Sequence, residues 1–419
     1  MFTLVGVSHH TAPLALRERV AIGEQQLPAA LATLREQVGP SAIVSTCNRT
    51  ELYASGAHDE RELIRFLAER SGVDAALIER HAATRRDVEA VRHLYAVASG
   101  VESMVVGESE VLGQVRAAFS AAVTAGSDDA LLSRLFHTAI RTARRARNET
   151  RVGAGALSVS TIAAQQARAL CPDPRRATVL VIGAGEAGRL AAESLAERGV
   201  RTLLVTNRTH ERAEALAAAL GGEAVDFAQL PDTLSRVDVV IAASGAESAL
   251  LSRGDVEAAV ARREGEPLVI LDIAMPRDVD PDVRTLPGVR YLDLDDLQGL
   301  AARNRGAREA EVAAVRAIVD AETERFIEWW EQLQVAPTIA ALTERAERLQ
   351  QREIERAARR MDASPEQREQ LDAMARALTA RLLHDPIAAL RERGDRDVYV
   401  QALRALFRLD EPAGPREEG

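Results

Sequence analysis

The chain has 419 residues and a formal net charge of −10, and its 53 Lys and Arg residues are all arginines. The absence of lysine excludes phosphate-binding loops that need a Lys, the strand Lys of protein kinases and lysine Schiff bases. Alanine is abundant and aromatic residues make up only 3%, a composition that favours long helices over a β-sandwich. The length predicts two or three domains.

Cysteine content and apolar runs bear on the cellular compartment. Cys47 and Cys171 are too few for a disulfide framework, so we expect a reducing cytoplasm. The first residues resemble no signal peptide, and no apolar run approaches the roughly 20 residues that cross a bilayer, so we expect no membrane association. Because no Cys and His cluster has metal-ligand spacing, we expect no metal site.

Residues 1–157 mix short apolar segments with helical patterns, which predicts an α/β domain. The predicted strands are 3–7, 42–45 and 52–54. The predicted helices are 24–37, 60–70, 87–99 and an arginine-rich helix over 128–151.

Residues 158–292 alternate between strand and helix patterns, which indicates a doubly wound α/β domain of the Rossmann type. A helix over 158–170 and a turn-prone break at 171–174 precede the first strand. The predicted strands are 177–182, 200–206, 223–227, 238–243, 268–273 and 289–292.

Residues 293–410 show no strand signal and are predicted to be helical. An apolar stripe from Val312 to Leu333 predicts a long helix that Pro337 interrupts, and Ser364 and Pro365 mark a further helix start. Such an arm cannot bury its stripe alone, so we expect a two-fold dimer; the alternative is a helical subdomain of a monomer. The tail, 411–419, is predicted to be disordered.

A glycine motif directly follows the strand over 177–182 and opens a helix. Its glycines suit a tight turn, close approach to a pyrophosphate and helix–strand packing, with amide donors at the helix N-terminus. This predicts a dinucleotide site rather than a structural turn, formed by Gly183, Ala184, Gly185, Glu186, Ala187 and Gly188. The next strand ends in Asn207, Arg208 and Thr209 in place of an acidic residue, which favours NADPH unless Arg208 is only a surface charge.

Cys47 lies where an apolar strand ends, among polar residues, unlike an inert core cysteine. Arg49, two residues away, is expected to favour the thiolate. By spacing alone, catalytic and structural interpretations of Cys47 are equally supported. His93 lies in a helix, where packing is the commoner role, and 107–114 is consistent with a loop and helix cap.

Together these segments resemble the glutamyl-tRNA reductase family over essentially the whole chain. The Ser-Thr-Cys-Asn-Arg-Thr-Glu run is the most specific of the segments that carry the resemblance, which are 6–13, 45–53, 98–114, 183–188, 207–209 and 272–278. The family implies a V-shaped homodimer with an N-terminal catalytic domain, a Rossmann-type NADPH-binding domain, a long spinal helix and a C-terminal all-helical dimerisation domain. It also implies NADPH-dependent reduction of glutamyl-tRNA(Glu) to glutamate-1-semialdehyde through a Cys47 thioester, the first step of five-carbon tetrapyrrole biosynthesis.

The resemblance also implies roles for individual residues. Cys47 and His93 match the catalytic positions. The positions that match the glutamyl-binding residues are Thr46, Asn48, Arg49, Ser103, Glu108, Ser109, Glu110 and Gln114. Many members carry Gln in place of Glu110, and an acid there would repel the substrate carboxylate unless it is protonated or paired.

Partners follow from the resemblance and from charge. Glutamyl-tRNA(Glu) is the implied substrate, and glutamate-1-semialdehyde aminomutase is an implied downstream partner. One predicted helix is rich in arginine, and phosphate contacts are as well supported there as a solvated helix face or interdomain salt bridges; the arginines are Arg134, Arg141, Arg144, Arg145, Arg147 and Arg151. Two alternative functions are an NADP-dependent dehydrogenase of a free small molecule, similar to shikimate dehydrogenase, and a non-catalytic NADPH-binding scaffold.

Overall fold

The computed structural model describes residues 1–103, 107–108, 110–152, 158–171, 176–246, 248–263, 265–302, 309–391 and 396–410. The chain forms two compact units, Met1–Thr323 and Glu324–Gly419. The predicted tail 411–419, the proposed site residue Ser109 and most of the predicted turn at 171–174 lie outside the described residues. Among the described helices, none has both the length and the apolar character needed to cross a bilayer.

The first unit begins with an antiparallel sheet in the order β2-β3-β1-β4. Its strands are β1 (Phe2–Ser8), β2 (Ser41–Ser45), β3 (Arg49–Ser55) and β4 (Ala83–Arg86). β3 begins three residues earlier than predicted, so the loop that joins it to β2 contains only residues 46–48. β4 was not predicted, because its alternation of half-buried and exposed residues includes no large apolar side chain.

Within the part of the chain that the structure describes, the helices that pack with this sheet form, together with it, what we call the antiparallel-sheet domain. They are α1 (Leu14–Val20), α2 (Leu27–Val38), α3 (Glu60–Ser71), α4 (Ala75–His81), α5 (Asp87–Ala98), α6 (Glu110–Thr124) and α7 (Ala130–Glu149). Asp129 caps α7 by accepting a hydrogen bond from the N–H of Leu132. Residues 110–114, interpreted from sequence as a loop and cap, form the first turn of α6.

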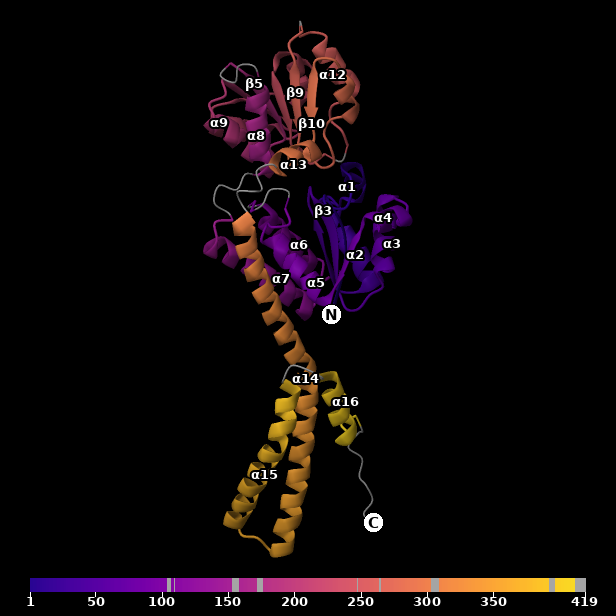
Figure 1. The fold of residues 1–419 in the computed structure, drawn as a ribbon, viewed down its shortest axis with the longest axis vertical. Coiled ribbons are helices and arrows are strands. Elements are labelled where there is room, and N and C mark those ends of the chain that lie inside the picture. The colour runs from indigo at the N-terminus through magenta and orange to yellow at the C-terminus, as the bar shows by residue number, and fades with distance from the viewer. Residues whose placement is uncertain are drawn as a thin grey trace. The chain divides into compact units, whose positions relative to one another are not determined.

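The second sheet is fully parallel, in the order β10-β9-β8-β5-β6-β7. Its strands are β5 (Thr178–Ile182), β6 (Thr202–Thr206), β7 (Glu223–Ala224), β8 (Val239–Ala242), β9 (Leu268–Asp272) and β10 (Val289–Leu292). Alternate residues of each long strand face opposite core clusters, so both faces are buried beneath helices (Figure 1). The strand order reverses between β5 and β8, the place where doubly wound sheets bind ligands.

We call this sheet and the helices around it the parallel-sheet domain. The helices are α8 (Val159–Leu170), α9 (Glu186–Glu197), α10 (His210–Leu220), α11 (Leu230–Thr233), α12 (Arg253–Val260) and α13 (Leu294–Ala302). Three short 3-10 helices cover Phe227–Gln229, Leu234–Arg236 and Pro281–Thr285. Leu294 and Leu297 of α13 belong to the same core cluster as α8 and α9, so α13 packs with this domain.

The remaining helices are α14 (Glu309–Met361), α15 (Pro365–Arg391) and α16 (Arg396–Leu406). The predicted interruption at Pro337 is wrong, because α14 continues through it. Pro337 removes one hydrogen bond to the carbonyl of Leu333. Both residues are exposed, so water can satisfy that carbonyl while the neighbouring turns keep their bonds. The predicted start of α15 is confirmed, since Ser364 and Gln367 exchange capping hydrogen bonds.

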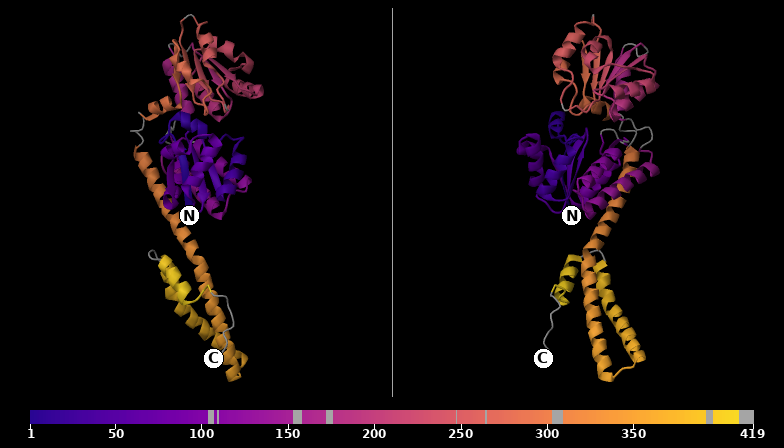
Figure 2. Two further views of the ribbon diagram at one scale, coloured as in Figure 1. Left: turned by 90° about the vertical axis from the view of Figure 1, so that its right-hand side faces the viewer. Right: turned by 180° about the vertical axis from the view of Figure 1, so that it is seen from behind.

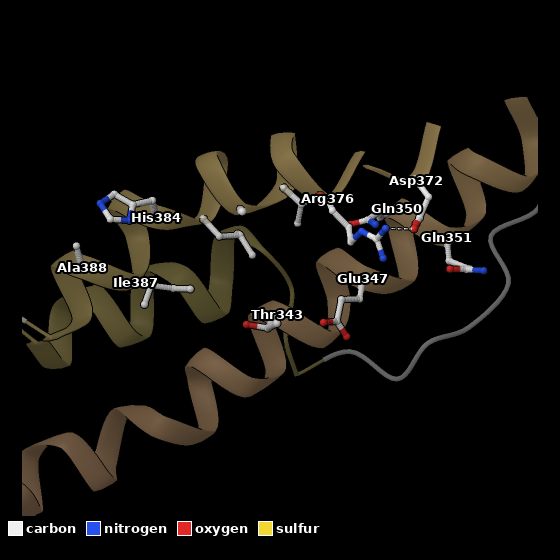
Figure 3. A pocket seen from close by; sticks show the side chains of 12 residues that line it. Thr343, Glu347, Gln350, Gln351, Asp372, Arg376, His384, Ile387 and Ala388 are labelled. Carbon is white, nitrogen blue, oxygen red and sulfur yellow. Dashed lines mark ion pairs between the residues drawn. The ribbon is translucent and has the colours of Figure 1, made fainter. Parts of the chain in front are cut away.

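The second unit contains an open groove between its two long helices. α15 runs back alongside α14 in each view (Figure 1 and Figure 2), and side chains of both helices line the groove (Figure 3). An ion pair of 2.7 Å joins Asp372 and Arg376 at its wall. The unit also exposes many large apolar side chains, namely Leu333, Leu349, Met361, Met374, Leu378, Leu382, Val398, Tyr399, Leu406 and Phe407.

Candidate active site

The loop that carries Cys47 is fixed by hydrogen bonds on both sides of the cysteine. The N–H of Thr46 donates to the carbonyl of Arg49 at 2.8 Å, and the N–H of Asn48 donates to the Thr46 hydroxyl at 3.1 Å. The Asn48 carbonyl accepts a 2.8 Å hydrogen bond from the N–H of His9. Cys47 is left half-buried at the tip of a short loop with little freedom to move.

The Cys47 thiol is protonated in this environment. Burial, together with the nearby carboxyls of Glu108 and Glu110, raises its pKa to about 12, whereas Arg17 opposes the rise. The expectation that Arg49 favours the thiolate is wrong, because its guanidinium is buried and paired with Glu51.

Glu51 is the centre of a buried network. Its carboxylate accepts hydrogen bonds from Arg49 Nη1 at 2.7 Å, His93 Nε2 at 2.8 Å and the Tyr53 hydroxyl at 2.7 Å. Burial alone would raise the pKa of Glu51, but His93 and Arg49 hold it well below its usual range. The network therefore holds an ionised carboxylate that fixes the positions of Arg49 and His93.

Sequence reasoning missed Glu51, although the signal was available. Residues two apart on a strand face the same side, so a strand that begins at Arg49 places Arg49 and Glu51 together. The same network holds His93 against Glu51. Among the contacts of the described residues, none joins His93 to Cys47.

Two acidic residues at the start of α6 lie close enough to influence Cys47. Burial raises the pKa of Glu108, an effect that a hydrogen bond with Ser103 opposes. Burial also raises the pKa of Glu110 to about 7, with further contributions from Glu108 and from Glu186 of α9, while Arg189 opposes the rise. Glu110 is thus near both the thiol and the first turn of α9.

The other predicted glutamyl-binding positions are distributed around these groups. Ser103 is buried, and Gln114 is half-buried one helical turn after Glu110. Several buried polar atoms near the thiol loop have no partner within the described residues: both ring nitrogens of His9, Oδ1 of Asn48 and Oε1 of Glu110. Burial lowers the pKa of His9 to about 3, so its ring is neutral. Such unsatisfied atoms favour a polar ligand at this place.

The glycine motif between β5 and α9 has the backbone geometry of a dinucleotide loop. Gly183 has a φ of +103°, and a Cβ there would lie 2.6 Å from the carbonyl oxygen of Ala243. A Cβ at Gly188 would lie 1.9 Å from the carbonyl oxygen of Gly183, so α9 packs closely on the loop. Gly185 faces open space, which leaves room for a phosphate group beside the helix N-terminus.

The end of β6 completes this cradle. Asn207 Oδ1 accepts a hydrogen bond of 3.2 Å from the N–H of Ala184, and Asn207 Nδ2 donates to the carbonyl of Thr209 at 2.9 Å. Arg208, between Asn207 and Thr209, is exposed. The hydroxyl of Thr206 is buried and has no partner within the described residues. These residues fit an NADPH molecule bound at the β5–β8 switch point.

The thiol loop meets the parallel-sheet domain directly. Cys47 packs against the core cluster beneath α8 and α9, as do Ala187 of the glycine motif and Met275. Cys47 and the dinucleotide loop therefore pack against the same core cluster of the parallel-sheet domain.

The segment after β9 is held by buried carboxyls. Asp272 accepts hydrogen bonds from the N–H groups of Ala274 at 3.1 Å and Val279 at 3.0 Å. Asp278 accepts from the N–H of Ser244 at 2.7 Å. Burial, together with the charge of Asp278, raises the pKa of Asp272 to about 7. The segment is thereby fixed next to the β5–β8 switch point.

The arginine-rich face of α7 is partly used for internal contacts. Arg141 Nη2 and Arg145 Nη1 pair with the buried Glu322 of α14 at 3.3 Å and 2.9 Å. Arg147 donates to the carbonyl of Glu108 at 2.6 Å. These three arginines make contacts within the first unit, whereas Arg144 is exposed, and phosphate contacts by this helix stay a prediction.

The described residues contain no group of three or more His, Cys, Asp or Glu side chains placed to hold a metal ion.

Comparison with known proteins matches three family models along the chain. Residues 5–150 match the glutamyl-tRNA(Glu) reductase N-terminal domain, 165–300 match shikimate/quinate 5-dehydrogenase, and 314–409 match the glutamyl-tRNA(Glu) reductase dimerisation domain. A glutamyl-tRNA reductase from Rubrobacter xylanophilus is 41% identical over 424 residues, covering 100% of this chain and 98% of the relative. One from Moorella thermoacetica is 41% identical over 416 residues, covering 96% and 94%. The chain belongs to the glutamyl-tRNA reductase family.

A solved structure agrees with this assignment. The glutamyl-tRNA reductase from Methanopyrus kandleri is 37% identical, with a TM-score of 0.53, and the match covers 98% of this chain and 99% of that one. Family membership confirms the resemblance and the predicted multidomain α/β fold class. Because the match covers the N-terminal and dimerisation domains as well, the dehydrogenase and scaffold alternatives are not favoured.

Proposed function

We propose that the chain catalyses the NADPH-dependent reduction of glutamyl-tRNA(Glu) to glutamate-1-semialdehyde, the first step of five-carbon tetrapyrrole biosynthesis. The observation that carries this proposal is the packing of Cys47 against the core of the parallel-sheet domain, the same core on which the glycine motif packs through Ala187. A dehydrogenase of a free small molecule would need no such thiol.

In the first step, the sulfur of Cys47 attacks the carbonyl carbon of the glutamyl ester. A C–S bond forms, the C–O bond to the terminal ribose breaks, and the thiol proton ends on the leaving ribose oxygen. Since the Cys47 pKa is raised, the proton must leave as the C–S bond forms. Glu110, with a pKa near neutrality, can exchange that proton.

The resulting thioester is less resonance-stabilised than the ester and is therefore the better hydride acceptor. NADPH supplies the hydride when bound; the residues that would hold it are Gly183, Ala184, Gly185, Glu186, Ala187, Gly188, Asn207, Arg208 and Thr209. Reduction gives a hemithioacetal on Cys47, whose C–S bond then breaks to release the aldehyde and return the thiol.

The glutamyl group is proposed to contact Thr46, Asn48, Arg49, Ser103, Glu108, Ser109, Glu110 and Gln114. The unpartnered polar atoms of Asn48 and Glu110 support this assignment. A protonated Glu110 would hydrogen-bond the substrate carboxylate instead of repelling it. Glu110 could then serve at the position where many family members carry the uncharged Gln. His93 is proposed to position the substrate or supply a proton, with its ring orientation set by Glu51.

The assembly is proposed to be a homodimer in the cytoplasm, with glutamate-1-semialdehyde aminomutase as a downstream partner. The exposed apolar side chains of the helical unit support dimerisation. The proposed domains are 1–157, 158–292 and 293–410. Packing of α8 on the parallel sheet supports the boundary at 157/158. Helix α13 lies after the proposed boundary at 292/293 but packs with the same sheet, which favours a later second boundary.

The test uses both cysteines of the chain. The wild-type chain, Cys47→Ser and Cys171→Ser are each incubated with glutamyl-tRNA and NADPH, and NADPH oxidation and aldehyde formation are followed. We expect Cys47→Ser to abolish reduction while NADPH still binds, and the Cys171→Ser control to remain active. Full activity of Cys47→Ser would refute the thioester mechanism. Binding of NADPH without oxidation by the wild-type chain would instead support a scaffold.

A further inference from the structure

Helix α1 links the thiol loop to the parallel-sheet domain through Arg17. Nη1 of Arg17 donates to the backbone carbonyl of Cys47 at 3.1 Å, and Nη2 pairs with Asp295 at the start of α13. The Arg17 side chain is only 2% exposed. One buried guanidinium therefore contacts both the residue that carries the thiol and a helix of the other domain.

In the second pair, α1 supplies the carboxylate, from the next residue, Glu18. Its carboxylate accepts hydrogen bonds from Nε and Nη2 of Arg277, both at 2.7 Å, and from the N–H of Arg277 at 2.8 Å. A bidentate arginine–carboxylate pair fixes the orientation of both partners as well as their distance. We call the pairs Arg17–Asp295 and Glu18–Arg277 the α1 clasp.

Apolar contacts reinforce the α1 clasp. Leu14, one helical turn before Glu18, is buried in the core cluster beneath α8 and α9. Cys47 and Met275 pack against this same cluster, and Met275 lies two residues before Arg277. Helix α1 and the thiol loop thus meet one surface of the parallel-sheet domain.

We propose that Arg17 and Glu18 are positioning residues that hold Cys47 in register with the parallel-sheet domain for the reduction step, an inference that rests on the proposed function. Acylation of Cys47 uses groups of the antiparallel-sheet domain, and NADPH binding uses groups of the parallel-sheet domain. Only reduction of the acyl group needs both domains at a fixed separation. Loss of the Glu18–Arg277 pair, which does not contact Cys47, is therefore expected to slow that step and to leave acylation and NADPH binding in place.

The experiment separates these three events. Glu18→Gln is compared with the double reversal Glu18→Arg with Arg277→Glu, and Arg262→Gln is the control because it removes an exposed ion pair with Asp232 inside one domain. Acylation of Cys47 is measured with labelled glutamyl-tRNA and no NADPH, NADPH binding by fluorescence, and reduction in a single turnover. A further readout, which does not depend on turnover, is how far bound NADPH protects Cys47 from an alkylating reagent.

We expect Glu18→Gln to slow single-turnover reduction by about 10- to 100-fold, since small displacements between reacting groups cost this much. Protection of Cys47 by NADPH should weaken, while acylation and NADPH affinity stay within about twofold of wild type. The double reversal should recover part of the lost rate, and Arg262→Gln should behave as wild type.

Unchanged reduction by Glu18→Gln, or an equal loss of acylation, would overturn the proposal. If Glu18→Gln does not fold, Asp295→Asn tests the other half of the clasp, because the Asp295 side chain is 42% exposed. Failure of the wild-type chain to form the thioester would contradict the proposed function instead, so the two failures are distinguishable.

Discussion

Replacing Glu51 by Gln removes the charge at the centre of the buried network. Three donors, from Arg49, His93 and Tyr53, converge on this carboxylate, and the side chains of Arg49 and Glu51 are only 2% and 3% exposed. Loss of one partner from a buried ion pair costs about 3–5 kcal/mol because the other charge stays buried. Gln keeps one acceptor oxygen, so we expect about 3 kcal/mol, the lower end of that range.

Hydrogen exchange measured by mass spectrometry is the suitable assay, because it reports local opening of one strand within a multidomain chain. About 3 kcal/mol corresponds to an increase of roughly 100-fold in the exchange rate of the β3 amides. The amides of β5, in the other sheet, serve as an internal reference.

Glu102→Gln provides the matched control. The Glu102 carboxylate lies 3.7 Å from His10 and 3.8 Å from Arg316, both as partly exposed pairs, which contribute at most about 1 kcal/mol. An increase of less than about tenfold for Glu51→Gln, or an equal effect of Glu102→Gln, would refute the view that Glu51 holds the network together.

Three further outcomes follow from the site. Arg208→Ala should lower the affinity for NADPH by about 10- to 100-fold and leave the affinity for NADH nearly unchanged, as measured by fluorescence titration. Equal losses of affinity for both cofactors would mean that Arg208 does not contact the 2′-phosphate. Gly188→Ala should lower the free energy of unfolding by about 2 kcal/mol or more, because the added Cβ meets a backbone carbonyl. Gly185→Ala should keep its thermal stability but bind NADPH more weakly. The reverse pattern would contradict the loop geometry. Since the Cys47 pKa is raised to about 12, its alkylation rate should keep rising above pH 9, and Glu110→Gln should speed it at pH 8 by removing a negative charge; a plateau near pH 9 would show an ordinary thiol.

Much of the fold could be predicted because periodic patterns and local signals determine it. The glycine motif, its strand and its helix lie within a short stretch of chain, so local sequence was sufficient. Pro337 was misinterpreted because a single proline is a weak signal within a helix of 53 residues. Helix α1, with seven residues, was too short to give a periodic pattern.

The residues of the site were identified mainly by resemblance, and their electrostatics were not. The predicted effect of Arg49 on Cys47 used sequence proximity, but Arg49 and Glu51 share a face of β3 and pair with each other. The charged partners of Arg17 and Glu18, which are Asp295 and Arg277, lie more than 250 residues away in the chain, so only the tertiary structure can show them.

The two domains of the first unit carry buried carboxyls that respond to acid in opposite directions. The pKa of Glu51 lies below its usual 4.5, so the stability it contributes is present above that pH and is lost as the pH falls further. The pKa of Asp272 is raised from 3.8 to about 7, so the cost of ionising it is felt above pH 7 and is relieved as the pH falls toward 4. On acidification, protonation of Asp272 therefore stabilises the parallel-sheet domain, while the stability contributed by Glu51 to the antiparallel-sheet domain is lost.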